Sequence, residues 1–211
     1  MRRVTDFPFA VEEHRHVAIP MPDGTTLSAR LWLPEGAREA PVPAILEYIP
    51  YRKNDATYPR DAEVHRYFAG HGYASVRLDI RGSGESEGIM TDEYTEQELQ
   101  DGFDAIQWLA QQPWCSGKVG MIGISWGGFN GLQVAAKQPP ALAAVVSVCS
   151  TDDRYADDVH YMNGCLLNDN LSWASTMFAR NTAPPDPTIV GEERWRAMWL
   201  ERLEHTGHWL I

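Results

Sequence analysis

Apolar and polar residues alternate along residues 12–20 and 26–33, and this pattern predicts two β-strands. The turn-forming sequence Pro22-Asp23-Gly24 separates them, so we expect a β-hairpin at the edge of a sheet. Four later runs are largely apolar and have the length of buried strands, at residues 41–49, 73–80, 119–124 and 143–148. We expect the last of these strands to be fully buried.

Helical patterns occupy the segments between these runs. Residues 64–68 give a short apolar helical face, and Thr95 with Glu98 has the spacing of a capping box at the start of a longer helix. Residues 126–137 predict a further helix that ends before two prolines. Strands that alternate with helices after an initial hairpin predict an α/β fold, whose mostly parallel sheet is covered on both faces.

The chain changes character after residue 150. Residues 151–180 are acidic and aromatic and then helical in pattern, and residues 192–203 predict a last helix beyond a group of three prolines. The tryptophans and methionine on that helix lie on one face, which we interpret as packing. We therefore expect two parts, with residues 1–150 forming the α/β part and residues 151–211 an added helical segment.

Composition limits the classes of protein that fit. With 211 residues, of which 44% are hydrophobic and 10% aromatic, the chain can bury a sizeable core. Its net charge of -11 argues against a nucleic-acid surface, since phosphate binding needs clustered Lys and Arg. Three widely spaced cysteines favour free thiols in a reducing compartment. Charged residues interrupt the N-terminal region, so we expect neither a signal peptide nor a membrane span and infer a cytoplasmic location.

The segment Lys118–Gly131 contains the strongest chemical motif. An apolar run ends at Ser125, and Gly123 and Gly127 stand two residues on either side of it. This is the G-x-S-x-G pattern between a predicted strand and a predicted helix, a turn that lifts the serine hydroxyl clear of the sheet. Glycines let the strand and the helix pass close together there. The motif predicts Ser125 as the nucleophile of an α/β-hydrolase.

The oxyanion hole of such an enzyme needs two hydrogen-bond donors. The backbone amide of Trp126, the residue after the nucleophile, should be one of them. The second should come from the loop after the third predicted strand, where the sequence is Ile-Pro-Tyr-Arg-Lys instead of a glycine-rich segment. A tyrosine hydroxyl can donate the same bond, so Tyr51 is a candidate, and a packed loop aromatic is the alternative interpretation.

A nucleophilic serine also needs a histidine and an orienting acid, which follow it along the chain in this fold. The residues after 148 have helical patterns, and none of their acids or histidines follows a convincing strand. Asp186 with His208 keeps the required order, but we favour a chain that stops before its triad is complete. The other candidates are Asp152, Asp153, Asp157, Asp158, Asp169, His160 and His205.

Neither a cofactor nor a metal is expected. The glycines of the loop Arg81–Gly88 do not match a dinucleotide-binding turn, because the third glycine is displaced and two glutamates would face a pyrophosphate. A Cys-x-x-Cys metal motif is absent from the sequence.

Residues 50–51 (Pro-Tyr), the loop 79–88 and the segment 114–128 occur in this order and together resemble the cocaine esterase-like (CocE/NonD) acyl esterases. That family belongs to the X-Pro dipeptidyl-peptidase superfamily of α/β-hydrolases. The resemblance spans nearly the whole chain and corresponds to the N-terminal portion of the family. It implies Ser125 as nucleophile and Tyr51 as the tyrosine that, with the amide after the serine, stabilises the oxyanion.

The resemblance also bears on the tail. It implies that residues 151–211 begin the family's helical cap, and that the sheet is incomplete. In the related α-amino-acid ester hydrolases, acidic residues near such a position help to hold a substrate ammonium group. Asp157 and Asp158 are candidates for that part, and a solvated acidic turn is the alternative. Family members continue past this length with the rest of the cap, the triad acid and histidine and a jelly-roll domain, so we expect a fragment.

These observations predict a serine hydrolase that cleaves small-molecule carboxylic esters, or amides, through an acyl-enzyme at Ser125. An X-Pro dipeptidyl-peptidase, an acyltransferase and a non-catalytic hydrolase-like fragment are the alternatives. We expect no nucleic-acid or membrane partner. Exposed sheet edges would favour self-association, so a homo-oligomer stays open.

Overall fold

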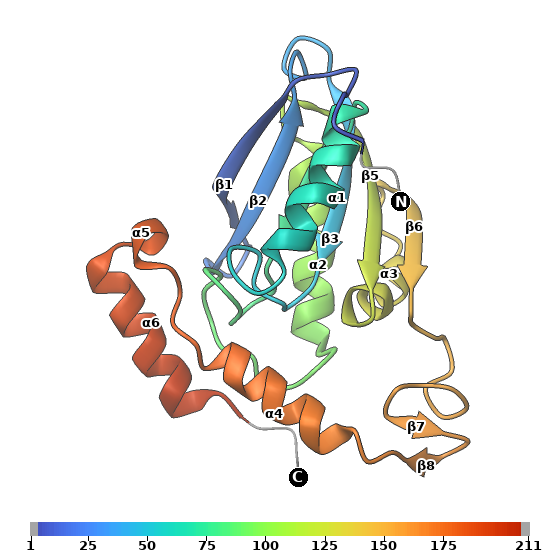
Figure 1. Cartoon of the computed structure of the whole chain (residues 1–211), viewed down its shortest axis with the longest axis vertical. Coiled ribbons are helices and arrows are strands. Elements are labelled where there is room, and N and C mark those ends of the chain that lie inside the picture. The colour runs from blue at the N-terminus through green and yellow to red at the C-terminus, as the bar shows by residue number, and fades with distance from the viewer. Residues whose placement is uncertain (1–3, 208–211) are drawn as a thin grey trace.

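A six-stranded sheet forms the centre of the computed structural model, which describes residues 4–207. Its strands in space follow the order β1-β2-β4-β3-β5-β6 (Figure 1). Along the chain they are β1 (Val11–Pro20), β2 (Thr26–Pro34), β3 (Val42–Tyr48), β4 (Ala74–Leu78), β5 (Cys115–Ile124) and β6 (Leu142–Val148).

The direction of the strands confirms a mostly parallel α/β sheet. β1 and β2 form the predicted antiparallel hairpin, and β2 runs antiparallel to β4. The other three pairings, β4 with β3, β3 with β5, and β5 with β6, are parallel. The parallel strands therefore end at one edge of the sheet, which is the edge where α/β proteins place their sites.

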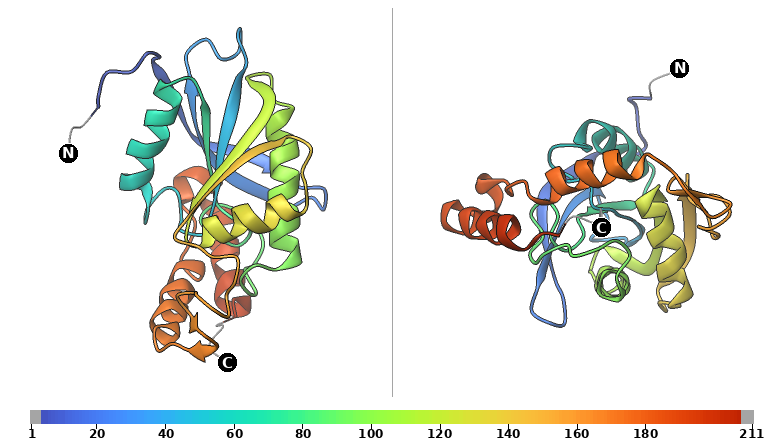
Figure 2. Two further views of the ribbon diagram at one scale, coloured as in Figure 1. Left: turned by 90° about the vertical axis from the view of Figure 1, so that its right-hand side faces the viewer. Right: turned by 90° about the horizontal axis from the view of Figure 1, so that it is seen from below.

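Three helices cover the sheet. α1 (Tyr58–Gly70) lies on one face, and α2 (Glu96–Ala110) and α3 (Trp126–Ala136) lie on the other (Figure 2). The predicted capping residue is confirmed, because the side chain of Thr95 accepts a hydrogen bond of 3.2 Å from the backbone amide of Glu98. α3 starts directly beyond the end of β5, with only Ser125 between the strand and the helix.

The face that α1 buries differs from the expected one. Val64 and Tyr67 are 40% and 45% exposed, so the apolar face predicted from residues 64–68 is wrong. The helix instead turns the fully buried side chains of Asp61 and His65 toward the sheet. Asp61 accepts a hydrogen bond of 3.1 Å from Arg77 in β4, and this partner makes its burial tolerable.

β6 is also exposed where a fully buried strand was expected. Val146 is 52% exposed and Val148 is 39% exposed. β6 is the edge strand of the six-stranded sheet and pairs only with β5 in it, and α3 packs against β6. The other face of β6 borders an apolar hollow of about 350 Å³, so the sheet is not covered on both faces there. An apolar run of residues shows that a strand can be buried, but it does not show whether a helix or a loop covers both of its faces.

The tail lies beyond the carboxyl ends of the parallel strands (Figures 1 and 2). It comprises β7 (Tyr161–Met162), β8 (Cys165–Leu166), α4 (Asn170–Asn181), α5 (Pro187–Val190) and α6 (Glu192–His205). The predicted last helix is confirmed, whereas the β7–β8 hairpin was not predicted because its strands are too short to give a pattern. The assignment of this tail to a cap stays a prediction. Within residues 4–207, no helix has the length and apolar character needed to cross a membrane.

Candidate active site

Ser125 occupies the sharp turn between β5 and α3. Its backbone has φ 53° and ψ -119°, a conformation that few residues other than glycine adopt. The backbone amide of Ser125 donates a hydrogen bond of 2.8 Å to the carbonyl of Val148, which fixes the strained turn to the end of β6. The half-buried side chain therefore stands at the carboxyl edge of the sheet.

The glycines of the motif are required by close packing. A Cβ atom on Gly123 would lie 2.2 Å from the carbonyl carbon of Gly127, so the strand and the helix cross in backbone contact. A Cβ atom on Gly128 would lie 2.6 Å from the hydroxyl oxygen of Ser150. Both distances are shorter than any ordinary Cβ contact, and larger residues would force β5 and α3 apart.

The hydroxyl group of Tyr51 meets the serine turn. It lies close enough to the Ser125 side chain and to the backbone amide of Trp126 for each of them to lower its pKa. Burial raises the pKa of Tyr51, and these two neighbours offset only part of that effect. Tyr51 is therefore protonated near neutral pH and able to donate. The structure thus brings together Ser125, Tyr51 and the Trp126 amide.

The loop that carries Tyr51 is anchored to the loop after β4. The backbone amide of Lys53 donates to Asp79 Oδ1 at 2.9 Å, and its ammonium group donates to Asp79 Oδ2 at 3.2 Å. Ser83 donates its hydroxyl proton to the carbonyl of Pro50 at 2.7 Å. A Cβ atom on Gly84 would lie 2.0 Å from Asp79 Oδ2. Gly84 therefore makes room for the buried carboxylate of Asp79.

Glu98 plays a part that the sequence pattern does not reveal. Its buried carboxylate accepts hydrogen bonds from the indole of Trp126 at 2.6 Å, the side-chain amide of Asn130 at 2.8 Å and the backbone amide of Tyr94 at 2.8 Å. Burial raises the pKa of Glu98 to about 7 despite these donors. Glu98 thereby fixes the first two turns of α3, which include the Trp126 amide. Only its capping-box spacing from Thr95 was visible in the sequence.

Helix α4 covers Tyr51 on the side of the tail. The Trp173 ring meets the Tyr51 ring edge to face, with centroids 5.8 Å apart. The guanidinium carbon of Arg180 lies 5.0 Å from the centre of the Tyr51 ring. Arg52 donates to the carbonyl of Pro184 at 2.8 Å. These contacts, between residues far apart in the sequence, attach the tail to the loop that carries Tyr51.

Arg202 of α6 makes a second attachment. Its buried guanidinium donates to the carbonyls of Gly84 and Ser86, each at 2.9 Å, and to that of Ala183 at 3.0 Å. Burial and the nearby charge of Arg52 lower the pKa of Arg202 to about 10. The tail therefore contacts both loops that hold Tyr51.

The two candidate acids of the tail have different surroundings. Asp158 is buried and pairs with Arg154, whose Nε lies 2.8 Å from its carboxylate. Arg154 in turn stacks over Tyr94 and Phe129, at 4.9 Å and 5.2 Å from the ring centres. Asp157 is exposed. A role for Asp157 and Asp158 toward a substrate ammonium group stays a prediction.

Among the histidines that the structure describes, none hydrogen-bonds Ser125. His160 lies 3.9 Å from the carboxylate of Asp169, and exposed His205 lies 3.8 Å from Glu204. Asp186 caps α5 by accepting from the amide of Thr188 at 2.8 Å. Its proposed partner His208 lies outside the described residues.

One buried cluster has the composition of a metal site. The side chains of Glu47, Asp61 and His65 lie within 4.8 Å of one another. Arginines already occupy the space beside them, with Arg60 at 2.8 Å from Glu47 and Arg77 at 3.1 Å from Asp61. Burial would raise the pKa of Glu47, but the hydrogen bond of His65 and the arginine charges lower it to about 2. We interpret the cluster as a structural ion network.

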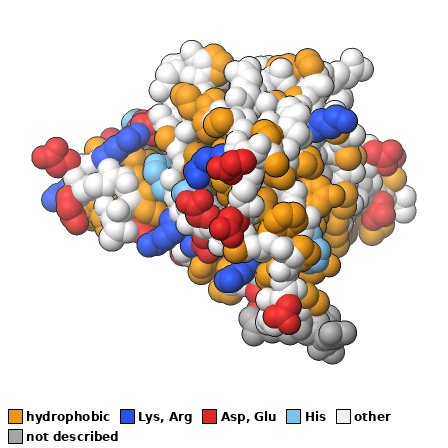
Figure 3. Space-filling model, turned by 90° about the horizontal axis from the view of Figure 1, so that it is seen from above, with side chains coloured by type: hydrophobic (Ala, Val, Ile, Leu, Met, Phe, Trp, Pro, Cys, Tyr) orange, Lys and Arg blue, Asp and Glu red, His pale blue; other side chains and the backbone are white. Residues whose placement is uncertain are grey.

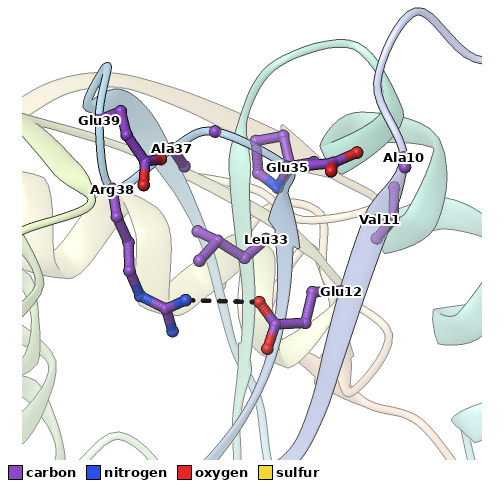
Figure 4. A pocket seen from close by; sticks show the side chains of 10 residues that line it. Ala10, Val11, Glu12, Leu33, Glu35, Ala37, Arg38 and Glu39 are labelled. Carbon is purple, nitrogen blue, oxygen red and sulfur yellow. Dashed lines mark ion pairs between the residues drawn. The ribbon is translucent and has the colours of Figure 1, made fainter.

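Another hollow lies at the opposite end of the sheet. It has a volume of about 670 Å³ and is lined by the start of β1 and the connection from β2 to β3 (Figure 4). Glu12 and Arg38 face each other across it at 3.6 Å. The surface at this end mixes basic and acidic side chains (Figure 3). The residues that line this hollow include no serine, cysteine or threonine that could act as a nucleophile. We therefore place the candidate active site at the end of the sheet that carries Ser125.

A strained serine between a parallel strand and a helix, with a tyrosine hydroxyl and the following amide beside it, defines an α/β-hydrolase of the serine-nucleophile class. Comparison with known proteins narrows the class. Residues 23–210 match the model of the X-Pro dipeptidyl-peptidase (S15) family. The chain belongs to this family, and the resemblance noted from the sequence is confirmed.

Named relatives agree with this assignment. A putative serine esterase of Mycobacterium bovis is 32% identical over 205 residues, which cover 90% of this chain and 31% of that protein. The cocaine esterase of a Rhodococcus species is 31% identical over 162 residues, which cover 76% and 28%. A CocE/NonD family hydrolase from Staphylococcus aureus has the same fold, with a TM-score of 0.72, 21% identity and coverage of 91% and 39%. The chain spans about a third of the length of these curated relatives.

Proposed function

We propose that this chain supplies the nucleophile and the oxyanion hole of a serine hydrolase that cleaves carboxylic esters. The observation that supports this proposal most directly is that the Tyr51 hydroxyl lies beside both the Ser125 side chain and the Trp126 amide. Serine esterases among the relatives support the choice of esters.

In the proposed reaction, Ser125 attacks the ester carbonyl and transfers its proton to a histidine base. Its Oγ forms the new bond to the carbonyl carbon, and the carbonyl oxygen becomes an oxyanion that accepts hydrogen bonds from Tyr51 and the Trp126 amide. Collapse of the intermediate expels the alcohol, which takes the proton, and leaves the acyl-enzyme. In the second half of the reaction the histidine takes a proton from water, and the water oxygen attacks the acyl-enzyme. Ser125 then leaves, takes up that proton and releases the carboxylic acid.

The described residues place neither a histidine base nor its orienting acid beside Ser125. We propose that both residues lie in further sequence, which the longer relatives have outside the part that this chain matches. Residues 151–211 would then begin a cap over the site, as α4 over Tyr51 suggests. Exposed free thiols at Cys149 and Cys165 support a cytoplasmic location.

The test uses the protein encoded by the complete reading frame. A fluorophosphonate probe should label Ser125, and the Ser125→Ala variant should lose both the labelling and the hydrolysis of 4-nitrophenyl esters. The family description also favours an X-Pro dipeptidyl-peptidase, so X-Pro 4-nitroanilides are measured beside the esters. Cleavage of the anilides in preference to the esters would select that activity. Ester hydrolysis that persists in the alanine variant would refute the proposal.

A further inference from the structure

Arg180 is the one arginine that α4 presents beside the oxyanion tyrosine. Its guanidinium lies 5.0 Å from the centre of the Tyr51 ring, and its side chain is half-buried. In residues 4–207 the structure gives it no ion pair and no side-chain hydrogen bond, and it lines an open space. A half-buried cation without a carboxylate partner costs desolvation energy that a bound anion would offset.

The space in question is an open hollow of about 560 Å³ between α4 and the loop after Tyr51. Three of its lining side chains are charged, namely Arg52, Asp55 and Arg180. Arg52 and Asp55 neutralise each other, because the Arg52 Nε lies 2.8 Å from Asp55 Oδ2 and its Nη2 lies 2.6 Å from the same oxygen. The lining therefore has one net positive charge, from Arg180, in a chain of net charge -11.

The position of Arg180 on the Tyr51 ring fixes which part of a substrate could reach it. A guanidinium that stacks on an aromatic face leaves its N–H edge free for a second partner. The Tyr51 hydroxyl, at the far end of the same ring, marks the position of the ester carbonyl. A group bound by Arg180 is thus separated from the carbonyl by roughly the length of a short acyl chain.

We propose that Arg180 binds a carboxylate on the acyl group of the substrate, so that the enzyme prefers half-esters of short dicarboxylic acids. This inference rests on the proposed function for its reaction, but its binding step requires only this chain's own residues. A single guanidinium fork matches the charge and planar geometry of one carboxylate. Arg180 is then a specificity-determining residue.

Binding is measured in the Ser125→Ala background, so that no turnover occurs. Monomethyl glutarate is the anionic probe, and dimethyl glutarate is its neutral counterpart, each titrated by isothermal calorimetry. We expect Arg180→Gln to weaken binding of the monoanion at least about tenfold, as for a lost hydrogen bond to a charged group, with little change for the diester. Arg180→Lys should retain part of the preference.

Arg196→Gln is the matched control, because it removes the same charge from an exposed position of α6. It should leave both affinities within about twofold, as expected for a distant exposed charge. Equal weakening of both probes by Arg180→Gln, equal effects of the two substitutions, or no preference for the monoanion in the parent protein would each overturn the proposal. Circular dichroism confirms that each variant is folded.

A kinetic comparison separates this inference from the proposed function. In the protein with Ser125 intact, Arg180→Gln should lower kcat/KM for mono-4-nitrophenyl glutarate and leave that for 4-nitrophenyl butyrate nearly unchanged. Equal losses would mean that Arg180 acts through Tyr51 and not by binding the carboxylate. Absence of hydrolysis of either ester, with preserved anion binding, would refute the esterase proposal alone.

Discussion

The carboxylate of Glu98 accepts a hydrogen bond of 2.6 Å from the indole nitrogen of Trp126. This bond joins α2 to the first turn of α3, directly after the nucleophile. The carboxyl group is buried, and burial raises its pKa from 4.5 to about 7. The bond therefore links a titratable group to the residue that follows Ser125.

We expect this group to make stability fall as pH rises. Between about pH 4.5 and 7 the folded protein holds a proton on Glu98 that the unfolded chain has released. Its contribution is thus fully present below pH 4.5 and lost as pH rises through 7, by up to about 3 kcal/mol. Urea denaturation between pH 5 and 8 measures the trend. Glu98→Gln should flatten it, whereas Glu96→Gln, at an exposed position, should leave it unchanged; a slope that survives in Glu98→Gln would contradict the assignment.

Tyr51→Phe tests the oxyanion hole. The substitution removes one hydroxyl donor and keeps the ring that packs against Trp173. Loss of one such donor costs about 3 kcal/mol, so kcat for a good ester should fall by about 10²- to 10³-fold with KM little changed. Steady-state kinetics on the variant decides this point. Fluorophosphonate labelling of Ser125 shows that the nucleophile remains in place, and a loss confined to KM would argue against a transition-state role.

Gly123→Ala tests the contact between β5 and α3. The new methyl group would lie 2.2 Å from backbone atoms of Gly127, so the turn must distort at a cost of about 1–3 kcal/mol or more. Gly120→Ala is the matched control on the same strand, because its methyl group would meet neighbours only at 3.7 Å and beyond. Thermal denaturation should show a clearly lower melting temperature for Gly123→Ala and an unchanged one for Gly120→Ala. Equal melting temperatures would mean that the crossing is less tight than described.

Lys53→Met tests the ion network beneath the Tyr51 loop. Lys53 is fully buried and pairs with Asp79 and Glu85, so its removal leaves Glu85 without its ion-pair partner and Asp79 with only Arg77, at 3.5 Å. Breaking a buried pair in this way costs about 3–5 kcal/mol. Lys118→Met, at an exposed position of β5, should cost little. Urea denaturation compares the two, and a similar small loss for both would show that the network contributes nothing.

The sequence was sufficient for those features that depend on local spacing. The strand, glycine and serine pattern around Ser125 predicted the strained turn, because its steric demands fall on neighbouring residues. Its place after the third strand made Tyr51 a candidate for the oxyanion hole, and that role stays a prediction. The Thr95 cap was predicted for the same reason, since a cap bonds an amide only three residues away.

Features that depend on distant partners were not predictable. Glu98 meets Trp126 and Asn130 across two helices, and Arg180 meets Tyr51 over 129 residues of chain. Nothing in a local pattern specifies such pairs. The buried polar face of α1 was missed because Arg77, which makes it tolerable, lies on another element. The exposure of β6 depends on what lies beside it and not on its own apolar residues.

The hydrogen bonds of Arg52 also impose an order on assembly. They reach the carbonyls of residues 180, 183 and 184, more than 120 residues further along the chain. Because the ribosome makes the chain from its N-terminus, Ser125 leaves the exit tunnel well before those carbonyls exist. The nascent sheet can thus form the serine turn first, while the loop of Tyr51 acquires its last anchors only after α4 has emerged. The loop that carries Tyr51 therefore gains these anchors only after residues 180–184 have been made.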